Sequence, residues 1–114
     1  MPWVNIVTGC SIPKDRRAET AEGISRTLNE VIGKDPAGVF VSFTRADDFY
    51  WGGSPRDDAA IFDLRWIGEF SADQKREISR RICGVIGPAA GLEAARTRVV
   101  FTSKAGEDWG RFTP

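Results

Sequence analysis

Pro2 is the residue of this chain best suited to acid–base chemistry. It follows Met1, and methionine is usually removed when the next residue is as small as proline. The new terminus would be a secondary amine that opens the apolar run Trp3–Val7. A free α-amine titrates at about 7.7–8.0, and burial or nearby cations lower that value. Such an amine can act as a general base near neutral pH in a chain that has no histidine. The alternative is a proline at position 2 without a chemical role.

The segment after position 104 offers a second set of polar and aromatic groups. It contains the run Asp108-Trp109-Gly110-Arg111-Phe112. Arg111 could hold a carboxylate, because a guanidinium presents two donors to two oxygens. The alternative is an arginine exposed on the surface. The aromatic side chains of the same segment are expected to dock on the chain's own core or on a neighbouring copy. The sequence has no phosphate loop, nucleotide fingerprint, Ser–His–acid set or metal-ligand cluster, so we expect no cofactor and no metal.

Size, charge and cysteine usage limit the function classes. A chain of 114 residues is expected to form one domain. Sixteen basic and sixteen acidic residues cancel, which gives no long-range attraction to nucleic acid or to an anionic membrane. We expect neither a signal peptide nor a membrane span. Cys10 and Cys83 lie far apart with no CxxC pattern, which is typical of a reducing cytoplasm.

A degenerate repeat divides the chain into halves at roughly 1–55 and 56–114. Ile24-Ser25-Arg26 recurs as Ile78-Ser79-Arg80, and Val31-Ile32-Gly33 recurs at the same offset as Val85-Ile86-Gly87. Each half contains a helical pattern between two apolar runs. The repeat therefore predicts two consecutive units of the same architecture.

The periodicity predicts strands at 3–8, 39–43, 60–67 and 99–101 and helices at 14–32 and 72–86. Gly33 and Gly87-Pro88 are natural helix ends, and Ser71 with Gln74 matches a capping box. Two β-α-β units of this kind form an α+β fold, a four-stranded mixed sheet with both helices on one face.

The other face of that sheet would be uncovered. Phe40 and Ile61 each lie next to apolar residues in the sequence, so these strands have apolar side chains on both faces of the sheet. We therefore expect a homo-oligomer that buries well over about 1,000 Å² per interface. The loop that links the halves carries Tyr50-Trp51-Gly52-Gly53. Its two aromatics predict a lid or an interface plug.

With these elements in place, the chain resembles the tautomerase superfamily in its long, two-unit form, and most closely the macrophage migration inhibitory factors. The resemblance covers nearly the whole chain. The matching features are Met1-Pro2 before a strand, Ile32-Gly33-Lys34 after the first helix, Trp51-Gly52-Gly53-Ser54 in the linking loop, Ile67-Gly68 after the third strand, and Trp109.

The resemblance implies a trimer with pockets between subunits around the N-terminal proline. It implies that Pro2 is the catalytic base and that Lys34 helps to bind a substrate carboxylate. Ile67 would line the pocket, and Trp109 would form an aromatic wall.

This chain also departs from the subgroups that it resembles. Val100 and Thr102 stand where migration inhibitory factors have a tyrosine and an asparagine. The tail is similar to that of the cis-3-chloroacrylic acid dehalogenases, where Asp108 would match the acid that activates water. The arginine pair of those enzymes is replaced by Ile67 and Phe70.

Three functions follow as alternatives. The first is a cofactor-independent keto–enol tautomerase acting on a small α-keto or unsaturated carboxylic acid. In this reading Pro2 is the base, and Lys34 and Arg111 hold the carboxylate of the substrate. Trp109 and Phe112 shield the site. The second is water addition to an unsaturated or halogenated acid with Asp108 and Pro2. The third is a non-enzymatic, cytokine-like trimeric binding protein. The sequence leaves the role of Arg65 open.

Overall fold

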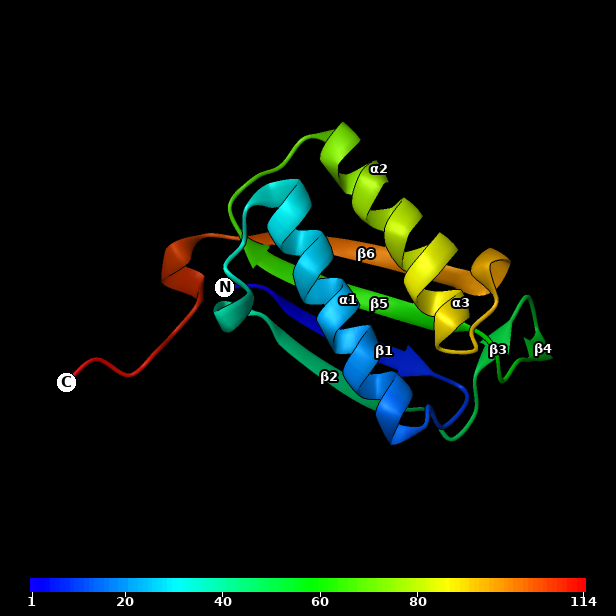
Figure 1. Ribbon diagram of the computed structural model, residues 1–114. Helices are drawn as coiled ribbons and strands as arrows, with labels where there is room; N and C mark the ends of the chain where they lie inside the picture. Colours follow the sequence, from blue (N-terminus) through cyan, green and yellow to red (C-terminus); the bar gives the residue numbers. More distant parts are fainter.

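The computed structural model describes residues 1–114, and its main elements form two layers (Figure 1). The strands of the main sheet are β1 (Trp3–Thr8), β2 (Phe40–Arg45), β5 (Ala60–Ile67) and β6 (Thr97–Lys104), and the helices are α1 (Lys14–Ile32), α2 (Ala72–Arg81) and α3 (Gly87–Ala89). Shorter elements are η1 (Pro36–Gly38), β3 (Tyr50–Trp51), β4 (Ser54–Pro55), the π-helical turn η2 (Ile82–Ile86), η3 (Ala94–Arg96) and η4 (Gly106–Asp108).

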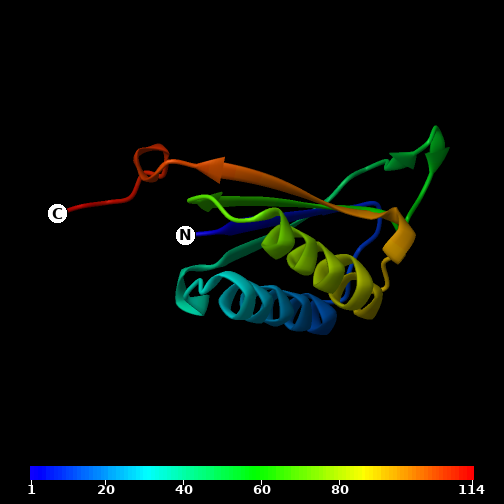
Figure 2. The same cartoon turned by 90° about the horizontal axis from the view of Figure 1, so that it is seen from above.

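Two parallel strand pairs meet in the middle of the sheet. The strand order is β2-β1-β5-β6. β1 is parallel to β2, β5 is parallel to β6, and β1 and β5 join the two halves as antiparallel neighbours. Both helices lie on one face of this sheet, as Figure 2 shows. The predicted fold class is therefore confirmed.

Alternating strand residues and one stripe of each helix form the core. On β1 and β5 the even-numbered side chains are buried, because successive residues of a strand point to opposite faces. They pack in one cluster with apolar residues of α1, α2 and the following turn; its fully buried members include Val4, Ile6, Ile24, Leu28, Phe62, Leu64, Trp66, Ile78 and Ile82. Each large apolar side chain buried in this way contributes about 1.5–3 kcal/mol.

The end of α1 fixes the position of Lys34. Gly33 adopts a left-handed conformation with φ of 70°, and its N–H bonds to the carbonyl of Asn29. The N–H of Lys34 reaches back to the carbonyl of Leu28 at 3.2 Å. The bond from the left-handed Gly33 to Asn29 is that of an αL cap, which glycine permits at low cost because it has no Cβ. The chain therefore leaves the helix sharply and brings Lys34 back toward the sheet.

The second helical region begins as predicted and ends later than predicted. The Ser71 side chain accepts from the N–H of Gln74, and the Gln74 side chain accepts from the N–H of Ser71, so the capping box is present. The expected stop at Gly87-Pro88 is wrong, because the chain continues through η2 into α3, which ends at Ala89. Pro88 lies in the first turn of α3, where a missing N–H costs little.

The last strand is also longer than predicted. The sequence indicated residues 99–101, whereas β6 runs over Thr97–Lys104. Its outer residues are polar and therefore lack the apolar signal on which the prediction relied. They nevertheless pair residue by residue with β5 as far as Ile67 and Lys104.

The face of the sheet opposite the helices, called the uncovered face below, is more polar than expected. It carries the alternate residues Trp3, Asn5, Val7, Phe40, Ser42, Thr44, Ile61, Asp63, Arg65, Ile67, Arg98, Val100, Thr102 and Lys104. Phe40 is 49% exposed, in agreement with an apolar site on this face. Ser42 links β1 and β2 there, since it accepts from the Trp3 indole N–H and donates to Asn5.

The linking loop folds into a two-residue hairpin. Gly52 and Gly53 have φ of 57° and 83°, which is the conformation of a type I′ turn. Strands β3 and β4 flank them, and the hairpin rises from the main sheet on its uncovered side (Figure 2). The Trp51 ring lies under the guanidinium of Arg98, 4.7 Å from its centroid. This contact fixes the hairpin above the beginning of β6.

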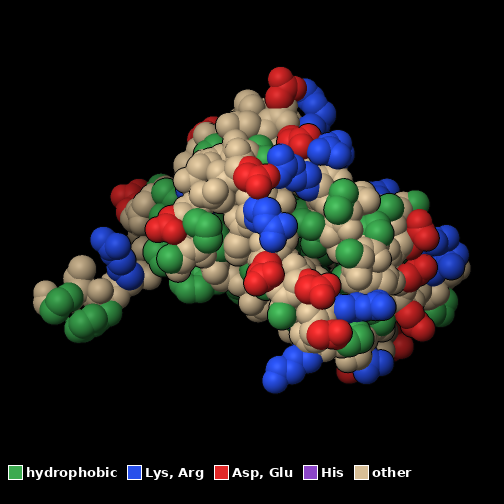
Figure 3. Space-filling model, viewed as in Figure 1, with side chains coloured by type: hydrophobic (Ala, Val, Ile, Leu, Met, Phe, Trp, Pro, Cys, Tyr) green, Lys and Arg blue, Asp and Glu red, His purple; other side chains and the backbone are tan.

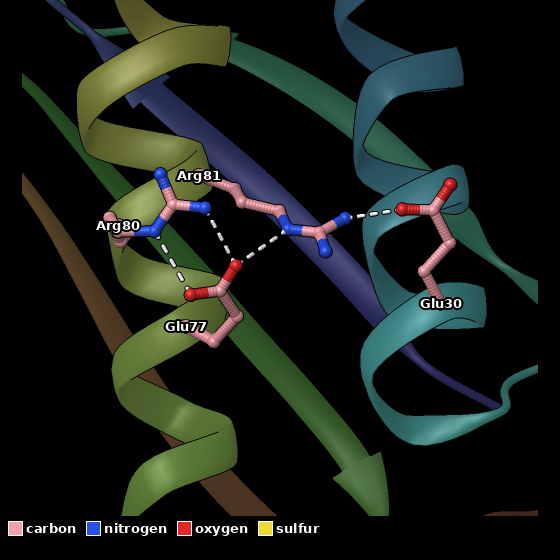
Figure 4. Close-up of polar contacts among 4 residues, drawn as sticks. All are labelled: Glu30, Glu77, Arg80 and Arg81. Atoms are coloured by element: carbon pink, nitrogen blue, oxygen red, sulfur yellow. Dashed lines mark hydrogen bonds and ion pairs between the residues drawn. The ribbon is translucent and has the colours of Figure 1, made fainter.

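The outer surfaces of the helices carry interspersed acidic and basic side chains (Figure 3). Four of these residues connect the helices (Figure 4): Glu77 accepts from Arg80 and Arg81, and Arg81 also pairs with Glu30 of α1 at 2.5 Å. Hydrogen bonds from the two arginines lower the pKa of Glu77 to about 2. The network therefore favours the packing of α2 on α1 while Glu77 is ionised.

This network predicts a pH dependence of stability. The pKa of Glu77 is lower in the folded chain than the value of about 4.3 in an unfolded one, so its contribution is present above that value and is lost as pH falls toward 2. Glu77→Gln should lower the melting temperature at pH 7 and should reduce its further decrease between pH 5 and pH 2. Thermal unfolding followed by circular dichroism measures both effects. Glu19→Gln on α1, a residue without an ion pair, is the control and should leave the profile unchanged.

Candidate active site

Pro2 lies at the start of β1, near the centre of one end of the sheet. Its side chain is fully buried, and its carbonyl accepts the N–H of Phe40 at 2.9 Å. The next residue, Trp3, is flanked by β2 on one side and β5 on the other. Met1 is 39% exposed. While Met1 is attached, the Pro2 nitrogen is an amide without a basic lone pair, so base chemistry at Pro2 requires that removal.

Lys34 and Ile67 lie in direct contact at the same end of the sheet. The Lys34 Nζ donates to the Ile67 carbonyl at 3.1 Å. The ammonium group also lies 5.2 Å from the centroid of the Phe70 ring, and Phe70 packs edge-on against Trp66 with centroids 4.5 Å apart. Because neither partner of the ammonium is an anion, Lys34 has no compensating charge and can attract a carboxylate.

The charge of Lys34 acts on the chain terminus. The pKa of the Met1 α-amino group is lowered from its ordinary value, first by partial burial and second by the positive charge of Lys34. Removing a proton from this end of the chain is therefore easier than in a free peptide. An amine held here is shifted in the direction that general-base chemistry near neutral pH needs.

A cavity of about 360 Å³ opens beside Ile67, within the size range of small-ligand sites. It lies between the end of β5 and the segment that joins β6 to η4. Its lining residues are Ile67, Gly68, Glu69, Ser103, Lys104, Ala105 and Gly106. Gly68 has φ of 101°, a value that favours glycine, and so turns the chain away at the end of β5. A larger cavity of about 720 Å³ lies between α1 and β2, and no predicted site residue lines it.

The C-terminal segment separates into a docked part and an exposed part. Trp109 is half-buried and stacks on Phe40, with ring centroids 6.5 Å apart and planes 8° apart. Asp108 is exposed at the end of η4. Arg111 is exposed and Phe112 is 88% exposed, on a tail that extends away from the body (Figures 1 and 3).

The predicted site residues are thus placed unequally. The structure brings Pro2, Lys34 and Ile67 to one end of the sheet and leaves the tail residues Arg111 and Phe112 outside it. The tail aromatics were expected to dock either on their own chain or on a neighbouring copy. Trp109 docks on its own chain, whereas Phe112 does not.

Sequence reasoning missed two residues that shape this end of the sheet. Phe70 was noted only as a replacement for an arginine, although its ring receives the Lys34 ammonium. Lys104 was not singled out, although it lies opposite Ile67 in the β5–β6 register and lines the cavity. A longer predicted strand would have placed Lys104 on the same face of the sheet as Ile67. The strand predicted from the sequence ended at residue 101 and therefore did not include it.

Other reactive groups do not form a site. Burial raises the pKa of the Cys10 and Cys83 thiols, so neither is activated as a nucleophile. No group of three or more metal-ligating side chains lies together. None of the helices combines the length and apolar character required to cross a membrane.

Many solved structures share this architecture, and three of them are compared with this chain. A macrophage migration inhibitory factor-like protein from Entamoeba histolytica is 23% identical, with a TM-score of 0.83 over 97% of this chain and 95% of that one. N1, a member of the cis-3-chloroacrylic acid dehalogenase family, is 16% identical, with a TM-score of 0.85 over 96% and 80%. A fused 4-OT wild-type asymmetric trimer, F6, is 16% identical, with a TM-score of 0.83 over 96% and 91%.

These likenesses show that the chain has the fold of the migration inhibitory factors and of the related tautomerase-superfamily proteins. No protein-family model matches the chain, and no curated protein matches it either. At these identities the likeness is one of fold, and the chemistry has to be argued from the residues.

The electrostatic effect of Lys34 on the chain terminus can be tested directly. Lys34→Gln removes a nearby like charge, so the pKa of the α-amino group should rise toward its ordinary value. An NMR titration of the terminal residue measures this shift. Lys14→Gln, at the other end of α1, is the matched control and should leave the pKa unchanged. Equal shifts in the two variants would show that Lys34 has no specific effect.

Proposed function

We propose that this protein is a cofactor-independent keto–enol tautomerase acting on a small α-keto or unsaturated carboxylic acid. Pro2 is the general base once Met1 has been removed. The observation that carries the proposal is the meeting of Pro2, Lys34 and Ile67 at one end of the sheet, with an uncompensated ammonium group beside the terminus. The fold shared with migration inhibitory factors and a 4-OT supports a role of this class.

The proposed reaction needs one proton carrier and one anchor for the acid group. Lys34 holds the substrate carboxylate, which places the adjacent carbonyl and its α-carbon next to the Pro2 nitrogen. The amine takes a proton from the enol oxygen or the α-carbon, and the resulting ammonium returns a proton to the other position. Ile67 and Phe70 supply apolar walls that limit access of water and strengthen the electrostatic interactions.

The proposal includes a homotrimer, in which the tail of a neighbouring copy completes the site. Arg111 and Phe112 do not pack on their own chain, and the uncovered face of the sheet has no partner within one copy. The fused 4-OT with the same fold is a trimer. In a closed assembly Arg111 would add a second contact to the substrate acid group, and Phe112 and Trp109 would shield the site from solvent.

Pro2→Ala tests the base. The variant should lose a factor of about 10²–10⁴ in kcat/KM for ketonisation of an enol acid such as enol-phenylpyruvate, because the positioned secondary amine is gone. Intact mass spectrometry must show that Met1 is absent from both proteins. Pro13→Ala, at the start of α1 and outside the site, is the control and should retain full activity. An unchanged rate in Pro2→Ala would disprove the role of Pro2 as base.

A second candidate function is water addition to an unsaturated or halogenated acid. Asp108 favours it, because this carboxylate ends η4, whose first residue, Gly106, lines the cavity beside Ile67. In this reaction Asp108 activates a water molecule and the protonated Pro2 amine donates a proton to the neighbouring carbon. The two functions use the same amine in opposite protonation states.

Asp108→Asn separates these functions. The variant should lose hydration of a halogenated unsaturated acid such as cis-3-chloroacrylate, because an amide cannot accept the proton of the attacking water, and it should keep ketonisation of enol-phenylpyruvate. Both rates are followed by ultraviolet absorbance. Glu107→Gln changes the adjacent exposed acid in the same way and should leave both activities intact. Equal loss of the two activities in Asp108→Asn would count against a separate water-activating role.

A further inference from the structure

A small cavity lies at the end of the sheet opposite Pro2, where β1 and β2 end and α1 begins (Figure 1). Its volume is about 80 Å³, and its lining residues are Thr8, Cys10, Ser11, Ile12, Arg17, Phe43, Thr44 and Arg45. Strand β1 has six residues and rises about 3.3 Å per residue, so the cavity lies roughly 20 Å from Pro2. It is therefore separate from the candidate active site and from the cavity beside Ile67.

Two arginines line this cavity without a carboxylate partner. Arg17 belongs to the first turn of α1, and Arg45 is the last residue of β2. Neither of them forms an ion pair within the chain. A guanidinium group keeps its charge at any physiological pH. The cavity is therefore lined by two positive charges that the chain itself does not compensate.

The acidic residues nearby do not occupy these arginines. Burial and the charge of Asp57 raise the pKa of the Cys10 thiol, whereas the charge of Arg45 lowers it, so both charges act on this side chain. Asp57 does not line the cavity, and neither does Asp58, which pairs with Arg96 at 3.8 Å. With its pKa raised, the Cys10 thiol is neutral at pH 7 and does not repel an anion.

The segment that follows β1 adds backbone donors to the same cavity. The N–H groups of Cys10, Ser11 and Ile12 donate to no carbonyl of the chain. The Thr8 hydroxyl donates to the Cys10 carbonyl at 2.6 Å and so holds this segment at the end of β1. Backbone N–H groups beside guanidinium groups are the donors that bind the oxygens of a phosphate.

We propose that this cavity binds a phosphate group, either as the free ion or as the end of a phosphomonoester. Its volume suits one small group and is too small for a whole drug-sized ligand. A phosphate dianion balances two guanidinium charges and offers several acceptor oxygens, whereas a carboxylate carries one charge on two oxygens.

The cavity also stays accessible in an assembly of several copies. Phe43 and Arg45 share strand parity with Val41, and both Val41 and Phe43 pack against the core under the helices. The cavity therefore opens on the helix-covered side of the sheet, and burial of the uncovered face does not close it. It shares no residue with the site of the proposed function.

NMR titration of the isotope-labelled protein with inorganic phosphate, at constant ionic strength, tests this site. Phosphate should shift the amide signals of residues 10–12 in a saturable manner and should bind about tenfold or more tightly than acetate. Arg17→Gln and Arg45→Gln should each weaken phosphate binding by about tenfold, because a charge-assisted contact is lost. Arg16→Gln changes the neighbouring exposed arginine, which does not line the cavity, and should bind phosphate like the unsubstituted protein.

A second titration with glycerol 3-phosphate identifies the source of the phosphate group. Tighter binding of this monoester assigns the cavity to an organic phosphate, and equal or tighter binding of inorganic phosphate assigns it to the free ion. The site would be rejected by the absence of a saturable shift at residues 10–12, by equal affinity for acetate and phosphate, or by equal weakening in Arg16→Gln and Arg45→Gln. Because no turnover is measured, these results do not depend on the tautomerase proposal.

Discussion

The antiparallel pairing of β1 with β5 is the constraint on which the rest of the structure depends. It joins two β-α-β units that have similar patterns but separate helices and strands. Its register places Trp3 opposite Arg65, so the first residues of the chain lie beside the last residues of β5. A slip of one residue would turn every buried side chain of one strand to the other face. The burial of Val4, Phe62 and Trp66 therefore also fixes where the chain terminus lies relative to Ile67.

Much of the fold could be predicted because the relevant signals are local. Alternation in 3–8 and 60–67 and the helical stripe ending at Gly33 give element bounds that the structure reproduces. The signals were insufficient where a polar or irregular segment continues an element. The π-helical turn η2 carries the chain past the expected stop at Gly87, and the polar end of β6 lacks an apolar pattern.

The candidate site could be predicted only in part for a related reason. Pro2 precedes β1, Lys34 follows the glycine that ends α1, and Ile67 is the last residue of β5. The family resemblance implied that these three residues belong to one site. Phe70 and Lys104 gain their places from tertiary contacts. Phe70 receives the ammonium group of Lys34, which follows the end of α1, and Lys104 pairs with the parallel strand β5. The exposure of Phe112 is likewise a property of the folded chain, since composition indicates only that an aromatic side chain should be covered.

The strand order leaves β2 and β6 each with one side that has no neighbour in the sheet. Backbone N–H and C=O groups along such borders readily pair with another chain, and nothing in this fold blocks them with a covering helix. A single copy therefore has two unpaired edge strands, one from each half of the repeat. In a closed ring, the β2 edge of one copy would face the β6 edge of the next, and every edge strand would have a partner. The same head-to-tail contact without closure would give a fibre. The two unpaired strand edges of a single copy are therefore where pairing with another copy would begin.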